Sequence, residues 1–154
     1  MKKQNGTQWL RIGMTLAATI ITLSSLTACS HVMTMVHAKV PAASEFGLGP
    51  RKSSSGLYTA TLQPAESLRP RKLQTQVALK DARGQAVDGA AITIDGGMPQ
   101  HGHGLPTQPR VTKALGNGAY LIEGVRFNMG GWWEFKLAIA GKTGNDTVTF
   151  NLAL

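Results

Sequence analysis

Residues 73–80 have the sequence LQTQVALK, in which Leu73, Val77 and Leu79 alternate with polar or small side chains. Successive side chains of a strand point to opposite faces of the sheet, so a period of two predicts a half-buried β-strand. The same alternation returns in TVTFNLAL at residues 147–154. Both stretches therefore predict strands that bury one face.

Further strands are expected between and before these two. The segments with similar patterning are 57–62, 90–94, 120–127 and 132–139, with a weaker one at 111–115. Turn-forming sequences separate them, namely DARG at 81–84, GNG at 116–118 and KTGN at 142–145. About seven short strands separated by such turns predict an all-β protein, with an immunoglobulin-like β-sandwich over residues 56–154.

The alternation also predicts which aromatic side chains are buried. The adjacent Trp132 and Trp133 must point to opposite faces of a strand, and Trp133 shares its face with the apolar residues that follow at every second position. We therefore expect Trp133 in the core and Trp132 near the surface. Gly124 would shift the alternation if it marks a β-bulge, so the pattern leaves open whether Tyr120 or Leu121 is buried.

The first residues have the organisation of a secretory signal. Basic Lys2, Lys3 and Arg11 precede an apolar stretch, 12–26, that Thr and Ser residues interrupt and that is shorter than a transmembrane helix needs. It ends in LTAC at 26–29, which resembles the lipobox of bacterial lipoproteins. We expect residues 1–28 to be a removable signal and Cys29 to be lipidated; a retained anchor helix is the alternative.

The residues after Cys29 predict where the protein is held. Ser30 stands where Asp would resemble the inner-membrane retention signal, so we expect a lipid-anchored protein of the cell envelope that faces the periplasm, with the outer membrane favoured. Residues 29–55 have no sustained hydrophobic period and contain several Pro, Gly and Ser residues. This composition predicts a flexible tether.

Charge and motifs exclude several functional classes. The chain has 16 basic and 8 acidic residues; three of the basic ones and none of the acidic ones lie in 1–28, which leaves 13 against 8, or +5. The short basic runs lack the interleaved aromatic residues of nucleic-acid grooves, so no nucleic-acid partner is expected. A surface for anionic lipid or polysaccharide stays an alternative. Nucleophile-elbow and phosphate-loop motifs are missing and the carboxylates are scattered, so we expect no enzyme.

The methionines and histidines beyond residue 28 are clustered, and seven of these eight residues fall in two patches. The first patch follows Cys29 and consists of His31, Met33, Met35 and His37. The second consists of Met98, His101 and His103, and the eighth residue is Met129. Imidazole and thioether ligands together suit copper, above all Cu(I), whereas structural zinc sites favour cysteine thiolates.

The second patch is the stronger candidate for a metal site. His101 and His103, two residues apart, can project to the same side of an extended segment, and the intervening Gly102 leaves room for an ion. We expect copper to bind through His101, His103, Met98 and Met129, with the first patch as a secondary site. The alternatives are a polar turn with Met98 and Met129 filling one end of the core, and a first patch that is only a linker.

Three elements in order resemble the YtkA-like and FixH-like domain family of small bacterial envelope proteins. They are MPQHGHG at 98–104, GAY at 118–120 and FNMGGW at 127–132, where Gly130 stands in the proline position of a Met-Pro-Gly-x-Trp form. The resemblance covers the chain from about Gly56 to its last residue. It implies an extracytoplasmic Ig-like domain without established enzymatic activity and, for some members, an association with copper handling or cytochrome oxidase assembly.

Two functions follow as expectations. The first is an envelope lipoprotein that binds copper, for delivery to a copper-accepting envelope protein or for cytochrome oxidase assembly. The second is a metal-free structural or protein-interaction sandwich, which would bind through an exposed edge strand or through Trp132. The two differ in whether function depends on the residues 98–104.

Overall fold

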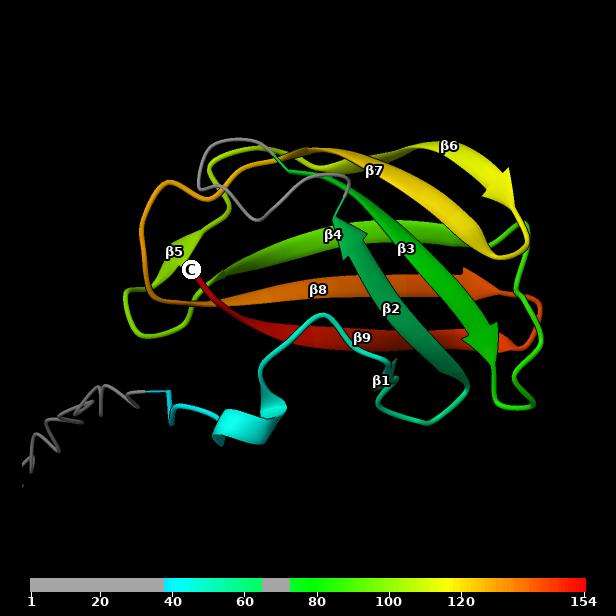
Figure 1. Cartoon of the computed structure of the whole chain (residues 1–154), viewed down its shortest axis with the longest axis horizontal. Helices are drawn as coiled ribbons and strands as arrows, with labels where there is room; N and C mark the ends of the chain where they lie inside the picture. Colours follow the sequence, from blue (N-terminus) through cyan, green and yellow to red (C-terminus); the bar gives the residue numbers. More distant parts are fainter. Residues whose placement is uncertain (1–37, 65–72) are drawn as a thin grey trace, which may run out of the picture. The chain divides into compact units, whose positions relative to one another are not determined.

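The structure, a computed structural model, describes residues 38–64 and 73–154. Seven strands of seven to ten residues account for most of it (Figure 1). They are β2 (Tyr58–Pro64), β3 (Leu73–Asp81), β4 (Ala91–Met98), β6 (Arg110–Gly116), β7 (Ala119–Val125), β8 (Trp132–Gly141) and β9 (Gly144–Ala153). The short elements are the 3-10 helix η1 (Ala43–Glu45) and the two-residue strands β1 (Arg51–Lys52) and β5 (His103–Gly104). The prediction of an all-β fold is confirmed.

The named strands pair antiparallel in the order β1-β2-β3-β7-β6-β4-β8-β9, with β5 added to β4. Between β6 and β4, one residue pair, Thr93 opposite Arg110, joins the strands over the described residues. The sheet folds over at this junction, so β2, β3, β7 and β6 form one layer and β4, β8 and β9 the other (Figure 1). The result is the expected β-sandwich.

The core lies between the two layers and follows the alternation of the sequence. Val77 and Leu79 on β3 are buried, as are Val148, Phe150 and Leu152 on β9. Trp133 is completely buried and packs edge-to-face on Phe127, with ring centroids 5.1 Å apart. The prediction that Trp133 belongs to the core is therefore confirmed.

Trp132 corrects the sequence prediction. It points away from Trp133 as expected, yet it is only 7% exposed rather than near the surface. Its indole N–H donates to the side-chain oxygen of Asn151 at 3.0 Å, and the Asn151 amide donates in turn to the carbonyl of Glu45. Asn151 also forms a β-bridge with Phe46. Trp132 is thus covered on a face that pattern alone assigns to solvent.

The segment before Gly56 is the second correction, because part of the predicted tether belongs to the fold. The backbone N–H of Gly47 donates to Asn151 at 2.9 Å, and that of Ser54 donates to Thr147 at 2.9 Å. Both acceptors lie on β9, whose outer edge would otherwise have unpaired backbone groups. Residues 43–55 are therefore ordered along β9, and residues 29–37 lie outside the described part of the chain.

Gly124 resolves the question that the pattern left open. Its φ of +81° and the shift in register between β3 and β7 mark a β-bulge. Tyr120 is buried, and its hydroxyl donates to the carbonyl of Val87 at 2.7 Å and accepts from the N–H of Ala90 at 3.0 Å. Tyr120 thereby fastens β7 to the connection that leads into β4.

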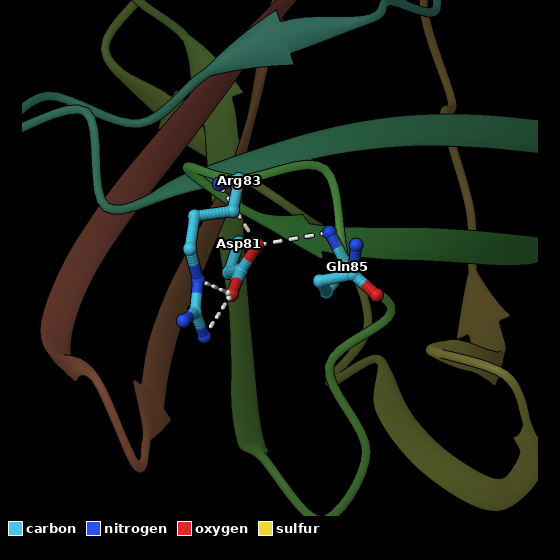
Figure 2. Close-up of polar contacts among 3 residues, drawn as sticks. All are labelled: Asp81, Arg83 and Gln85. Atoms are coloured by element: carbon cyan, nitrogen blue, oxygen red, sulfur yellow. Dashed lines mark hydrogen bonds and ion pairs between the residues drawn. The ribbon is translucent and has the colours of Figure 1, made fainter.

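The turn after β3 is organised by one carboxylate. Asp81 accepts hydrogen bonds from the backbone N–H groups of Arg83 and Gln85, both at 2.9 Å, and from the Arg83 guanidinium (Figure 2). The Gln85 N–H and the contacts with Arg83 lower the pKa of Asp81, while burial opposes the shift. The turn predicted at 81–84 is confirmed.

A second carboxylate fixes the connection from β1 to β2. Asp146 accepts from the backbone N–H groups of Ser55 at 3.1 Å, Leu57 at 3.2 Å and Thr147 at 2.8 Å. The Ser53 hydroxyl, followed by these N–H groups, lowers the pKa of Asp146 to about 2 against the opposing effect of burial. Asp146 thus ties the residues before β2 to β9.

In residues 38–64 and 73–154, no helix has the length and apolar character to cross a membrane.

Candidate metal site at the histidine loop

The histidine loop, residues 98–104, is a tight hairpin between β4 and β5. Met98 pairs with His103 and Gly97 with Gly104. The N–H groups of His101 and Gly102 both donate to the Met98 carbonyl, at 3.0 and 2.9 Å, and Gly102 has a φ of +65° that glycine adopts without strain. The loop is therefore a turn at residues 98–102, and not the extended segment that the sequence spacing predicted.

This turn brings the two imidazoles together. The rings of His101 and His103 are nearly parallel, with an angle of 8° between their planes and 6.2 Å between their centroids. Both residues are exposed to solvent. The expectation that the two histidines project to one side is met, although a turn produces the arrangement.

Met98 lies in a different environment from the imidazoles. Its side chain is only 1% exposed and belongs to the hydrophobic core. A Cβ atom added to Gly131 would lie 3.1 Å from the Met98 methyl carbon, so this side chain packs closely on the loop between β7 and β8. Of the two roles that the sequence left open for Met98, the structure supports the core-filling one.

Met129 is on that neighbouring loop and is exposed. Its side chain is 41% exposed, so Met129 does not fill the end of the core. Its backbone carbonyl accepts from the Trp133 indole N–H at 3.1 Å, which fixes the loop beside the start of β8. Gly131 of the same loop packs on Met98, so the loops of Met129 and of the histidines lie at the same end of the sandwich.

A shallow hollow of about 290 Å³ adjoins the histidine loop. Its charged lining residues are Asp95, Glu134 and Lys136, next to His103. The amine of Lys136 lies 2.7 Å from the Glu134 carboxylate and offsets its charge. Sequence reasoning missed these neighbours, because only the strand register places Glu134 opposite Gly97.

The exposed donor groups at this end of the sandwich belong to three residues. Two imidazoles are paired and accessible, and one thioether is exposed on an adjacent loop. Among the described residues, no three His, Cys, Asp or Glu side chains gather into a metal-binding group. The predicted lipidation residue Cys29 and the secondary patch His31, Met33, Met35 and His37 lie outside the described residues.

Comparison with known protein families identifies the family of this domain. A family model described as YtkA-like matches residues 52–138, which is more than half of the chain. The chain belongs to the YtkA-like family. The matched region of this YtkA-like protein begins in β1, includes the histidine loop and Trp133, and ends within β8.

Family membership confirms the resemblance found in the sequence and suggests a small envelope protein. Searches of curated proteins and of solved structures give no match to this YtkA-like chain. Beyond the family, function is therefore argued from the residues themselves.

Proposed function

We propose that this YtkA-like protein binds one copper ion, preferentially Cu(I), through His101 and His103 and passes it on. The observation that supports the proposal is the pair of exposed, parallel imidazole rings 6.2 Å apart on an ordered hairpin. The hydrogen bonds of Gly102 and His101 to Met98 hold the hairpin before any ligand arrives. A preformed pair loses less conformational entropy on binding than two histidines on a free segment.

The chemistry of the donors favours copper over other ions. Imidazole binds copper in either oxidation state, and a thioether shifts preference toward Cu(I). Met129, exposed on the adjacent loop, is the thioether that we assign to the site, and Met98 is left out because its side chain is buried. Because the protein supplies only a few ligands, coordination positions on the copper ion stay open for a partner protein. Such a site suits transfer of the ion rather than catalysis.

The cellular setting is part of the same proposal. We infer that residues 1–28 are removed, that Cys29 is lipidated, and that the domain faces the periplasm from the outer membrane. The sequence LTAC at 26–29 supports this inference. The partner is then an envelope protein that accepts copper, and the secondary patch of His31, Met33, Met35 and His37 would bind copper on its way to or from the domain.

A Cu(I) competition titration of residues 30–154 tests the proposal. We expect the double variant His101→Ala/His103→Ala to lose most of the affinity for Cu(I). Among single variants, Met129→Leu should weaken Cu(I) binding more than Met98→Leu does. Met98→Leu is the matched control, because it removes a thioether from the core with a volume change that cores tolerate. Gln100→Ala controls for general changes to the loop, and Zn²⁺ controls for metal preference.

The alternative function also has an observation in its favour. Among the residues that the structure describes, one edge of β6 has no partner strand beyond its single pair with β4, and Leu115 on this strand is 41% exposed. An open edge of this kind can pair with a strand of another protein. Equal copper affinity of the wild type and the double histidine variant would contradict the copper proposal and favour this interaction module.

A further inference from the structure

The outer face of the layer formed by β1, β2, β3, β7 and β6 carries an excess of positive charge (Figure 1). Residues that pair across antiparallel strands point to the same side of a sheet, so the register shows which side chains share this face. Its charged residues, among those that the structure describes, are Lys52, Lys80, Arg110, Lys113 and Glu123. We call this surface the basic face. The outer face of the other layer has the opposite balance, with Asp95 and Glu134 against Lys136.

The cations of the basic face point outward and are exposed to solvent. Lys80 alternates with buried residues of β3, and pairing through β2 aligns it with Lys52 on β1. On β6, Lys113 and Arg110 pair with the two residues of β7 that flank the buried Ile122. The ion pairs found within residues 38–64 and 73–154 involve none of these cations. Their charges are therefore available to an external anion.

The spacing of the lysines indicates what kind of anion fits the basic face. Lys52 and Lys80 lie two strands apart, or about 10 Å with about 4.8 Å between neighbouring strands. Lys113 lies roughly 16 Å from Lys80, because four residues along β3 and two strands across the sheet separate them. Positions this far apart do not bring all the amines to one small anion. They fit a polymer with negative charges on repeating units.

The uncharged side chains among the lysines are hydroxyl and amide groups. On β2 and β3 they are Thr59, Thr61, Gln63 and Gln76. The carboxylate of Glu123 accepts a hydrogen bond from the amide of Gln74, so a neighbouring side chain already engages it. Hydroxyl and amide groups donate and accept hydrogen bonds, as the hydroxyl groups of sugars do. The basic face thus combines spaced cations with groups that can bind sugar units between the charges.

Other classes of polyanion fit this surface less well. The aromatic residues described on these strands, Tyr58 and Tyr120, are buried, so neither provides a stacking platform for single-stranded nucleic acid. Centres of protein interfaces are enriched in aromatic residues, Met and Arg and are depleted of Lys. Leu115 is the large apolar side chain that these described strands expose, which is too little for stable insertion into a bilayer.

We propose that the basic face binds an acidic polysaccharide, with its lysines on the carboxylates of the polymer and its Thr and Gln side chains on the sugar hydroxyls. The proposal goes beyond copper binding and requires neither His101 nor His103. Surface charges of this kind are screened by salt, so the affinity should depend strongly on ionic strength.

Binding of alginate, a carboxylated polysaccharide, tests the proposal on the full chain purified in a non-ionic detergent. We expect alginate but not neutral dextran to bind, and the affinity to fall several-fold between about 0.05 M and about 0.2 M NaCl. Lys80→Gln/Lys113→Gln should bind alginate about tenfold more weakly, since each lysine contributes modestly. Lys80→Arg/Lys113→Arg keeps both charges and should bind like the wild type.

The matched control is Lys136→Gln/Lys142→Gln, which removes the same charge from the opposite face and from the β8–β9 turn. It should change alginate affinity less than about twofold, and thermal unfolding verifies that all variants fold, as exposed substitutions usually permit. Absence of alginate binding, or equal weakening by the two Gln double variants, would overturn the proposal. Tighter binding per negative charge to poly-L-glutamate, or to detergent micelles containing phosphatidylglycerol, would also overturn it and identify an acidic protein or a lipid as the ligand.

Discussion

Trp132 and Trp133 have the same chemical character and adjacent positions, yet their burial has different origins. Trp133 is buried by the alternation that the sequence itself displays. Trp132 is buried because Asn151, nineteen residues later, bonds its indole and lies beside Phe46. The sequence was sufficient to predict that the two side chains point to opposite faces of the strand. It was not sufficient to predict that the outer face is covered at Trp132, because this depends on where a segment distant in the sequence docks.

Both tryptophans should therefore matter for stability. Replacing a buried aromatic residue by Ala costs about 3–5 kcal/mol, and we expect Trp133→Ala to fall in or above this range. Trp132→Ala should also destabilise clearly. Trp132→Phe keeps an aromatic ring but leaves the side-chain oxygen of Asn151 without its donor, and this loss should lower the free energy of unfolding by about 1–3 kcal/mol. Urea unfolding measures all three, and near wild-type stability of Trp132→Ala would contradict the structure.

The residues of the candidate site were also only partly predictable, because local sequence determines some of their positions and packing determines the others. The sequence identified His101 and His103, and the turn that Gly102 permits does bring their rings together. It could not assign Met98, because a methionine at the end of a strand fits both a core and a metal site. Strand register and packing decide that Met98 is buried while Met129 is exposed.

At the scale of the elements, the pairing of β4 with β5 positions the histidine loop. A Cβ atom added to Gly97 would lie 2.2 Å from the carbonyl oxygen of His103, whereas one added to Gly104 would have an ordinary contact at 3.8 Å with Gly96. The two glycines face each other in the same pair of strands. Only the first position requires the absence of a side chain.

We expect Gly97→Ala to push β5 away from β4, which should lower both the melting temperature and the affinity for Cu(I). Gly104→Ala is the matched control and should change both quantities much less. Thermal unfolding and Cu(I) competition on the two variants make the comparison. Identical behaviour of the two variants would show that the short β4–β5 hairpin does not position the imidazoles.

The Asp146 contacts predict how stability depends on pH. The pKa of Asp146 is lowered from 3.8 to about 2 in the folded protein, so its ionised form is stabilised by folding. This contribution is complete above about pH 4 and is lost as the pH falls toward 2. Asp81, whose pKa is also lowered, acts in the same direction.

The midpoint of urea unfolding should therefore decrease between pH 4 and pH 2. Asp146→Asn should be less stable than the wild type at pH 6, and its midpoint should decrease less steeply on acidification. Parallel curves for the two proteins would mean that Asp146 does not hold the residues before β2 in the way its hydrogen bonds indicate.

At the scale of the whole molecule, the periodicity and turn chemistry were sufficient to predict the sandwich. Seven strands lie close to the expected segments, and six of them bury alternate positions, whereas β6 has no buried residue. The ordered part of residues 29–55 was missed, because segment 43–55 is held largely by backbone hydrogen bonds to β9 and β2 rather than by a hydrophobic pattern. Backbone groups are alike in every sequence, so such docking leaves little trace in composition.

The proposed anchor makes a prediction for the whole chain. Cys29→Ser should accumulate as an unprocessed precursor, because lipid attachment precedes removal of a lipoprotein signal. Mass spectrometry of membrane and soluble fractions distinguishes the precursor from the mature form. Ala28→Gly keeps a small residue before Cys29 and serves as a control that should mature. Normal maturation of Cys29→Ser would exclude lipidation at this residue.

Copper binding by this YtkA-like protein depends, in our proposal, on His101 and His103 as ligands of a bound Cu(I) ion. X-ray absorption at the copper edge of the loaded protein observes those ligands directly. We expect a first shell dominated by imidazole nitrogen, together with the outer-shell scattering of the rings, and we expect both to disappear in His101→Ala/His103→Ala. A shell dominated by sulfur, or a spectrum that the double substitution leaves unchanged, would contradict it.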